Sequence, residues 1–251
     1  MTGRAGDPIS EADRITAEYA SRSRKLPAGF YSLSKPVNLF LRQTRDREVI
    51  ALLSRLGFFP LTGKRILDVG CGTGKGLLDF ELWGAAREDL AGIDLFKDHV
   101  EAARMRLGAI VDEQGIRTGA ADIRLGDATQ LPWDRVTFDL VAQSTVFSSI
   151  LDPDARRAVA EEMIRVLSPG GIILWYDFFV DNPRNPNVRG VRKAEVAQLF
   201  PKFRMKSRRV TLMPPLARHA VQFSWLLAEL LSELRILNTH LLLALIPEVG
   251  A

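Results

Sequence analysis

An aspartate and a run of alternating glycines stand at the end of one short apolar segment. Residues 65–76 read RILDVGCGTGKG, with Asp68 inside the apolar run and Gly70, Gly72 and Gly74 behind it. Glycines allow tight turns and let backbone N–H groups approach a ligand without intervening side chains. The stretch therefore predicts a ligand-binding turn at the end of a buried strand.

The spacing of these glycines excludes two common phosphate-binding motifs. A G-x-G-x-x-G fingerprint that begins at Gly70 would need glycine at position 75, which is Lys75. The G-x-x-x-x-G-K-[ST] loop is excluded because Gly76, and not Ser or Thr, follows Lys75. Asp68 would also repel a pyrophosphate, whereas its carboxylate suits a cationic group such as the ammonium of a bound amino acid.

Two further acids stand at the ends of the next apolar runs. Asp94 ends AGIDL about twenty residues after the turn, where an acid can accept both hydroxyls of an adenosine ribose. Asp127 follows IRLG, where its carboxylate can accept from an adenine amino group. A ligand that has an ammonium, a ribose and an adenine but no phosphate is S-adenosylmethionine.

The sequence resembles the class I S-adenosylmethionine-dependent methyltransferases from Lys64 to Phe179. The resemblance rests on five segments in family order: LDVGCGTG, GIDL, GDATQLPW, FDLVAQS and VLSPGGIILW. It implies an α/β fold, a doubly wound seven-stranded Rossmann-like sheet whose last strand is antiparallel. It also implies methyl transfer from S-adenosylmethionine, with S-adenosylhomocysteine as product and no metal required.

The resemblance carries cofactor roles onto particular residues. Leu95 and Ala128 would frame the adenine, and Gln143 would lie beside the methionine end. Cys71 is expected to pack inside the turn and not to act as a nucleophile, since no histidine is near it in sequence. Taken singly, Asp68 and Asp127 could instead cap the turn or helix that follows each. The full predicted cofactor-binding set is Tyr31, Asp68, Gly70, Cys71, Gly72, Gly74, Asp94, Leu95, Asp127, Ala128 and Gln143.

Candidates for the acceptor side follow the fifth apolar run, in LWYDFFVDNPRNPN. If the acceptor is a hydroxyl, a base that takes its proton helps the reaction. Asp177 is the first candidate base and His219 the second, although Asp177 could simply pair with an arginine. The predicted substrate contacts are Tyr176, Asn182, Arg184 and Trp225, with Tyr31, Gln43 and Arg45 as candidate lid contacts.

Short apolar runs alternate with helical segments from residue 64 onward, which predicts a parallel sheet covered on both faces. Asp152 and Pro153 suit the start of a helix. Strands are expected at 65–69, 90–95, 123–128, 138–144, 171–179, 204–213 and 239–247. Helices are expected at 37–56, 76–83, 97–114, 154–167 and 191–200, with one long amphipathic helix at 214–234.

This pattern predicts one methyltransferase domain at residues 26–251. Within it, 26–62 would form a helical cap, 63–180 the cofactor-binding core, and 181–251 the substrate-side region. The preceding residues 1–25 are polar, with a weak helical pattern, and are expected to be partly mobile.

Composition narrows the function further. The chain of 251 residues carries a net charge of +4, which suits a solvated basic surface or a patch for anions. Its one cysteine excludes an internal disulfide, and its three histidines lack ligand spacing for a metal. The first 25 residues lack the apolar core of a signal peptide, and no apolar run reaches about 18 residues. We expect a cytoplasmic protein without a transmembrane segment, with peripheral membrane contact left open.

The acceptor is predicted only as a class. Methylases of DNA-base amines resemble one another in an Asn/Asp-Pro-Pro-aromatic run after the fourth strand, and its absence here argues against a nucleic-acid partner. A looser likeness to bacterial methyltransferases of sugars, glycolipids and secondary metabolites, through YDFFVDNPRNPNVRG, favours a small molecule. We prefer a hydroxyl on a sugar-containing or lipid-like compound.

Two alternatives remain open at this stage. The first is an N- or C-methyltransferase acting on a natural-product scaffold. The second is a non-catalytic S-adenosylmethionine-binding regulatory or assembly protein. The apolar face of residues 216–234 could be packed, line an acceptor pocket, form a dimer contact or lie on a membrane, so a monomer and a homodimer are both compatible with the sequence.

Overall fold

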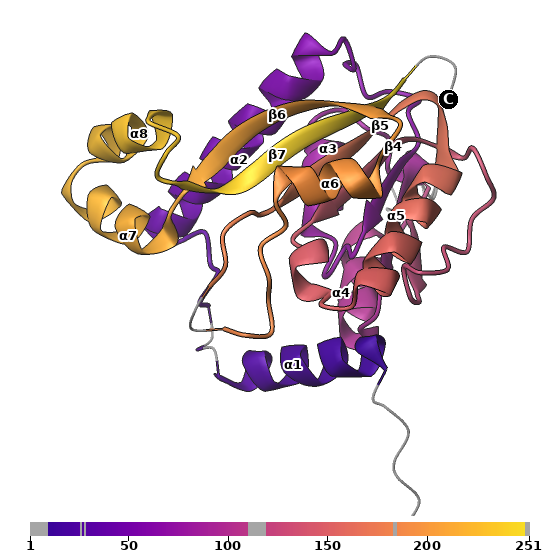
Figure 1. Ribbon diagram of the computed structural model, residues 1–251, viewed down its shortest axis with the longest axis horizontal. Coiled ribbons are helices and arrows are strands. Elements are labelled where there is room, and N and C mark those ends of the chain that lie inside the picture. The colour runs from indigo at the N-terminus through magenta and orange to yellow at the C-terminus, as the bar shows by residue number, and fades with distance from the viewer. Residues whose placement is uncertain (1–9, 26, 28, 110–118, 183–184, 249–251) are drawn as a thin grey trace, which may run out of the picture.

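The computed structural model describes residues 10–25, 27, 29–109, 119–182 and 185–248. Seven strands form one sheet in the order β3-β2-β1-β4-β5-β7-β6 (Figure 1). The neighbouring strands from β3 to β5 are parallel, and β7 is antiparallel to both β5 and β6. The predicted doubly wound sheet with an antiparallel last strand is confirmed. The strands are β1 Ile66–Val69, β2 Leu90–Asp94, β3 Asp122–Leu125, β4 Phe138–Ser144, β5 Leu167–Phe178, β6 Phe203–Leu212 and β7 Asn238–Pro247.

Helices cover both faces of this sheet (Figure 1). One core joins α5, α6 and Ile15 of α1 to one face, and a second core joins α2, α3 and α4 to the other. Strands β1 and β2 are buried along their whole length, as expected for parallel strands between two helical layers. The helices are α1 Glu11–Lys25, α2 Pro36–Arg55, α3 Lys75–Leu82, α4 Lys97–Leu107, α5 Pro153–Val166, α6 Lys193–Leu199, α7 Pro214–Phe223 and α8 Trp225–Glu233, with short 3-10 turns η1 Arg87–Asp89 and η2 Phe147–Ser149.

The strand order reverses beside β1, and this reversal opens a crevice. The chain passes from β1 outward to β2 and β3, then returns to place β4 on the other side of β1. The loops that follow β1 and β4 therefore leave in opposite directions. Ligands of open α/β sheets bind at the carboxyl ends of strands at such a point.

Three segments differ from the sequence prediction. The expected single helix at 214–234 is wrong, because the backbone is extended at Ser224 and its Oγ accepts from Leu227 N, so that α8 begins there as a separate helix. The N-terminal segment was expected to lie outside the domain, but its residues 11–25 form α1, which buries Ile15 in the core. The predicted helix at 97–114 ends at Leu107, and its residues 110–114 lie outside the described ones.

The start of α5 supplies a test of helix capping. The Asp152 carboxylate accepts from Asp154 N and Ala155 N, and Pro153 occupies the first turn, as predicted. Asp152→Ala should lower the free energy of unfolding by about 1 kcal/mol in urea denaturation, because two backbone donors lose their acceptor. Asp154→Ala, which removes an exposed carboxylate in the first turn of the same helix, should change it by no more than about 0.5 kcal/mol. Equal losses in the two variants would contradict this account.

Candidate functional site

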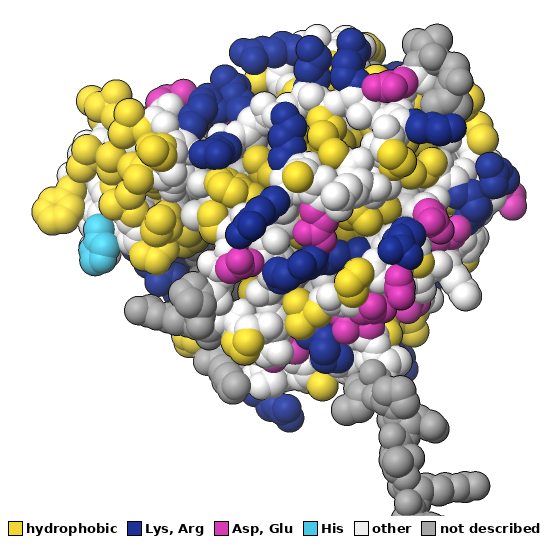
Figure 2. Space-filling model, in the orientation of Figure 1, with side chains coloured by type: hydrophobic (Ala, Val, Ile, Leu, Met, Phe, Trp, Pro, Cys, Tyr) yellow, Lys and Arg dark blue, Asp and Glu magenta, His cyan; other side chains and the backbone are white. Residues whose placement is uncertain are grey.

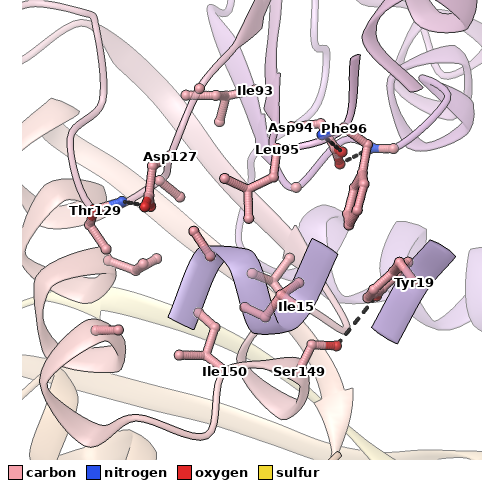
Figure 3. A pocket seen from close by; sticks show the side chains of 18 of the residues that line it. Ile15, Tyr19, Ile93, Asp94, Leu95, Phe96, Asp127, Thr129, Ser149 and Ile150 are labelled. Atoms are coloured by element: carbon pink, nitrogen blue, oxygen red, sulfur yellow. Dashed lines mark hydrogen bonds between the residues drawn. The ribbon is translucent and has the colours of Figure 1, made fainter. Parts of the chain in front are cut away.

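A cavity of about 210 Å³ lies in the crevice at the carboxyl ends of the strands. The turns after β1, β2 and β3 form one side of it, and the segment from β4 to α5 forms another (Figure 3). Helix α1 covers the remaining side. Six of the predicted cofactor residues line this cavity: Gly70, Gly72, Asp94, Leu95, Asp127 and Ala128.

The glycine turn after β1 leaves no room for side chains. Gly70 has a φ of +70°, and a Cβ at this position would lie 2.4 Å from Val146 Cγ2 in the loop after β4. Gly72 has a φ of +52°, a conformation that side-chain-bearing residues rarely adopt. The two loops that diverge at the crevice thus touch at Gly70, and the backbone of the turn faces the cavity.

Asp68 is a buried acid that lacks a polar partner. It lies in the middle of β1, and its Oδ2 faces the first turn of α3, 2.7 Å from where a Cβ of Gly76 would stand. Among the described residues, neither a hydrogen bond nor an ion pair satisfies this carboxylate. Burial raises the pKa of Asp68 to about 7, the Asp94 charge adds to the rise, and Arg45 opposes it. Such a group suits an incoming cation, because a cation would remove the cost of ionising it.

Asp94 ties the glycine turn to the end of β2. Its Oδ2 accepts from Gly72 N at 2.8 Å, and its Oδ1 accepts from Phe96 N at 3.0 Å (Figure 3). His99 Nδ1 lies 3.2 Å from the same Oδ1, and this contact raises the pKa of His99. The carboxylate therefore fixes the backbone of the turns that follow β1 and β2.

Asp127 lies at the cavity edge after β3. Its Oδ1 accepts from Thr129 N at 2.8 Å, so it closes a local turn while it lines the cavity (Figure 3). The capping role that the sequence left open for Asp127 is thus present, in a turn and not in a helix. Its second oxygen has no protein donor among the described residues.

Helix α1 is held over the cavity by polar contacts at several points. Glu11 accepts from Leu151 N, and Arg14 donates to the carbonyl oxygen of Ser149. Further along the helix, Tyr19 Oη lies 3.3 Å from Ser149 Oγ. Ile15 and Tyr19 point from α1 toward the other lining residues (Figure 3).

The sequence prediction did not include these residues of α1 in the site. The signal that could have found them is the spacing of Ile15 and Tyr19, which are four residues apart and therefore share one face of a helix. Phe96 and His99, which follow Asp94, also line the cavity and were missed.

Asp177 does not project over the crevice as predicted. It is fully buried, its Oδ2 accepts from Ser148 N at 3.1 Å, and its Oδ1 accepts from Phe178 N at 2.8 Å. Burial raises the pKa of Asp177 to about 6, while these hydrogen bonds and the charge of Arg156 oppose the rise. The carboxylate holds the backbone of η2, and among the described residues no arginine forms an ion pair with it, so the alternative of an arginine partner is not found either.

Tyr176 is half-buried and lies away from the cavity. It lies on the opposite face of the strand from Asp177, because successive residues alternate. Its Oη lies 2.7 Å from Thr211 Oγ1, and its ring stacks on that of His240 at 4.7 Å between centroids. The prediction that Tyr176 and Asp177 both face a substrate is therefore wrong.

The remaining acceptor candidates are dispersed. His219 is exposed on α7, and the ring of Trp225 packs edge-on against Phe40. Neither residue lines the cavity, so the prediction that they reach the reacting atoms is wrong. Asn182 follows β5 outside the lining, and Arg184 lies outside the described residues.

Four predicted cofactor residues support the turn or lie elsewhere. Gly74 precedes α3, and the Cys71 side chain is buried in the core, where burial raises the pKa of its thiol. Gln143 is buried beneath the loop after β4, and its Oε1 accepts from Val146 N at 3.1 Å. Tyr31 is exposed outside the cavity lining. In the described ranges, no group of three or more His, Cys, Asp or Glu side chains is placed to hold a metal ion.

The buried state of Asp68 predicts a pH-dependent stability. Because the pKa of Asp68 in the fold is about 7 against an ordinary 3.8, the folded chain holds a proton that the unfolded chain has lost between these values. The free energy of unfolding should therefore fall as pH rises from about 4 to about 7. Asp177 contributes in the same direction up to about pH 6.

Urea denaturation at a series of pH values tests this. Asp68→Asn should flatten the profile between about pH 6 and 7, where Asp177 no longer contributes. Glu161→Gln, an exposed change on α5, should leave the profile unchanged. A wild-type stability that rises across this interval would contradict a buried, unpartnered Asp68.

Comparisons with known proteins agree with this site. A family model described as a methyltransferase domain matches residues 66–171. An O-methyltransferase of Pyrenophora dematioidea is 33% identical over 139 residues, which are 55% of this chain and 47% of that protein. A demethylmenaquinone methyltransferase of Clavibacter sepedonicus is 35% identical over 134 residues, 52% of this chain and 46% of that protein. The chain thus spans about half the length of these relatives.

Solved structures match over more of the chain. A possible histamine N-methyltransferase from Thermotoga maritima matches with a TM-score of 0.58 and 16% identity, over 93% of this chain and 99% of that one. The [4+2]-cyclase SpnF matches with a TM-score of 0.55 and 21% identity, over 83% of each chain. These likenesses show the fold.

The sheet order, the glycine turn and the matched domain converge on one assignment. Residues 66–171 match a methyltransferase domain, and the chain has the Rossmann-like fold of the class I S-adenosylmethionine-dependent methyltransferases.

Proposed function

We propose that the chain transfers a methyl group from S-adenosylmethionine to a hydroxyl of an apolar small molecule. The observation that carries this proposal is the cavity itself, which joins the strand-end acids Asp94 and Asp127 to an apolar wall under α1. Fold likeness alone does not select the reaction, since one structural neighbour is described as a cyclase.

The residues at the strand ends fit this cofactor. Asp68 would accept from its ammonium, Asp94 would face its ribose hydroxyls, and Asp127 would face its adenine amino group. The backbone of Gly70 and Gly72 would lie against it, since a side chain has no room at Gly70 and Gly72 has a positive φ. When bound, the cofactor supplies a methyl group on a cationic sulfur, which a nucleophilic oxygen can accept.

The wall opposite these acids is apolar and enclosed. Ile15 of α1 faces Phe96 and Ile150 across the cavity, and Val159 of α5 adds to the same surface (Figure 3). Tyr19 and Ser149 supply hydroxyl groups at its edge. This lining favours a lipid-like or aromatic acceptor over a free sugar, and the cover of α1 favours a small molecule over a polymer.

Among the described residues that line the cavity, no carboxylate is left without another role to take the proton from the acceptor hydroxyl. Glu11 pairs with Arg14 and accepts from Leu151 N, and Asp177 lies outside the cavity. An acidic hydroxyl, such as that of a phenol or an enol, needs less help from a base. We therefore favour an acceptor of this kind, and the names of the O-methyltransferase and demethylmenaquinone methyltransferase relatives agree with a small-molecule acceptor.

A labelled-methyl assay tests the reaction. With S-adenosylmethionine labelled in its methyl group, the chain should label phenolic or enolic lipid-like compounds in preference to sugars, amines and nucleic acid. The carbon chemical shift of the labelled methyl in the product would show whether it is bound to oxygen, nitrogen or carbon. Cofactor binding without turnover across the whole panel would instead favour a non-catalytic binding protein.

Calorimetry tests the cofactor assignment. Asp68→Asn should weaken S-adenosylmethionine binding by about tenfold or more at pH 8, because a charged hydrogen bond to the ammonium is lost. Asp98→Asn removes an exposed carboxylate near the same crevice and should leave the affinity within about twofold. Equal affinities for wild type and Asp68→Asn would refute the role of Asp68.

A pair of tyrosine variants tests the acceptor wall. Tyr19→Phe should raise the KM for the acceptor by about threefold to tenfold, because one neutral hydrogen-bonding group leaves the cavity edge. Its affinity for S-adenosylmethionine should stay the same. Tyr31→Phe is the matched control, since Tyr31 lies outside the cavity lining, and it should change neither value. An effect of Tyr31→Phe without one of Tyr19→Phe would reverse the two assignments.

A further inference from the structure

Helix α8 turns its large apolar side chains away from the protein. Ala228 and Ser232 are buried against the core, whereas Leu226, Leu230 and Leu234 are exposed. These leucines recur every four residues and therefore form one row along the helix. An ordinary surface helix has the opposite arrangement, with leucines inward and small or polar residues outward.

Neighbouring residues extend this row into a larger surface, here called the α7–α8 apolar surface. Phe223 is 85% exposed, Ile236 75% and Leu226 67%. Hydrophobic side chains gather at the end of the molecule where α7 and α8 project beyond the sheet (Figures 1 and 2). The surface consists of Met213, Phe223, Trp225, Leu226, Leu227, Leu230, Leu234 and Ile236.

The acids next to this surface are neutralised. Glu229 pairs with Arg47 at 2.7 Å, and Glu233 pairs with Arg235 at 3.1 Å. These pairs leave no net negative charge along the outer side of α8.

Cations without a carboxylate partner stand at its edge. Arg218 on α7 and Lys35 before α2 both lie over the ring of Phe30, at 5.6 and 5.4 Å from its centroid. In the part of the chain that the structure describes, no Asp or Glu pairs with either of them. Further Lys and Arg side chains border the surface toward β6 (Figure 2). The apolar surface thus has a positively charged rim.

We propose that the α7–α8 apolar surface docks onto a membrane that contains anionic lipids. Exposed Leu, Phe and Trp side chains can enter the boundary between headgroups and acyl chains, while Arg218 and Lys35 remain among the phosphates. Among the described residues, no helix is long and apolar enough to cross a bilayer. The docking is therefore peripheral, by one pair of short helices.

The charge of the rim argues against a second copy of the chain as the occupant. A two-fold interface brings the same patch of each subunit together. Arg218 and Lys35 of one subunit would then lie close to those of the other, without acids to neutralise them. An anionic lipid surface is complementary to the same rim.

Flotation of the full chain with vesicles tests the proposal. The chain should bind phosphatidylcholine vesicles that contain phosphatidylglycerol more tightly than vesicles of phosphatidylcholine alone. The double variant Leu226→Gln, Leu230→Gln should lower this binding at least tenfold, because two apolar anchors are removed. The double variant Arg218→Gln, Lys35→Gln should lower it by roughly fivefold per charge on anionic vesicles, and addition of salt should lower it further.

Matched exposed residues serve as the control. Leu82 is 80% exposed and Met105 82%, and both lie outside the α7–α8 apolar surface. Leu82→Gln, Met105→Gln should bind vesicles like wild type. Because this test needs no acceptor, it can fail while the proposed methyl transfer stands, and unchanged S-adenosylmethionine binding would show that each variant folds.

Two results would overturn the proposal. The first is absence of binding to anionic vesicles, or an equal loss in the control variant. The second is a wild-type dimer in sedimentation experiments that becomes a monomer on Leu226→Gln, Leu230→Gln, since it would assign the surface to a second copy of the chain.

Discussion

The structure of the site depends on two carboxylates that the sheet forces close together. Asp68 and Asp94 lie buried on the adjacent parallel strands β1 and β2, and the charge of Asp94 disfavours ionisation of Asp68. Asp94 is compensated by Gly72 N and Phe96 N, which it uses to shape the glycine turn. Asp68 has no such compensation among the described residues. A buried carboxylate without a polar partner lowers the free energy of unfolding. A cationic ligand beside Asp68 would offset this loss.

The cover of α1 over the cavity would strengthen the interaction between the strand-end acids and a cationic ligand. Helix α1 reaches across the strand ends and contacts the segment between β4 and α5 through Glu11, Arg14 and Tyr19. Exclusion of water strengthens electrostatic interactions, so the same cover that supplies an apolar wall would also strengthen contacts between the acids and a cation. The N-terminal helix and the strand-end acids therefore belong to one site, although they are far apart in sequence.

The sequence predicted the sheet well, and six of the residues that it assigned to the cofactor line one cavity, because both depend on local patterns. The segments RILDV and AGIDL are short apolar runs that turn residues follow. A strand that fills each run therefore places its acid at or near the end of the strand. The sequence pattern did not predict the break between α7 and α8 at Ser224, since the apolar residues on both sides of it keep helical spacing. Their outward direction depends on what packs beneath α8, which is a tertiary property.

The acceptor side was predicted poorly for a related reason. Asp177 follows the same apolar-run pattern as Asp68, but its neighbours in space are backbone N–H groups of η2 and not an open crevice. Conversely, Ile15 and Tyr19 lie in a polar segment that shows little sign of a binding role until α1 is placed over the strands.

Proton release on cofactor binding tests the central claim most directly. If S-adenosylmethionine binds with its ammonium against Asp68, binding at pH 6 must expel the proton that this buried acid holds, whereas Asp68→Asn has no such proton to expel. Calorimetric titrations at pH 6 in buffers of different ionisation enthalpy should then give binding enthalpies that depend more strongly on the buffer for wild type than for Asp68→Asn. An equal dependence in the two proteins would contradict the account.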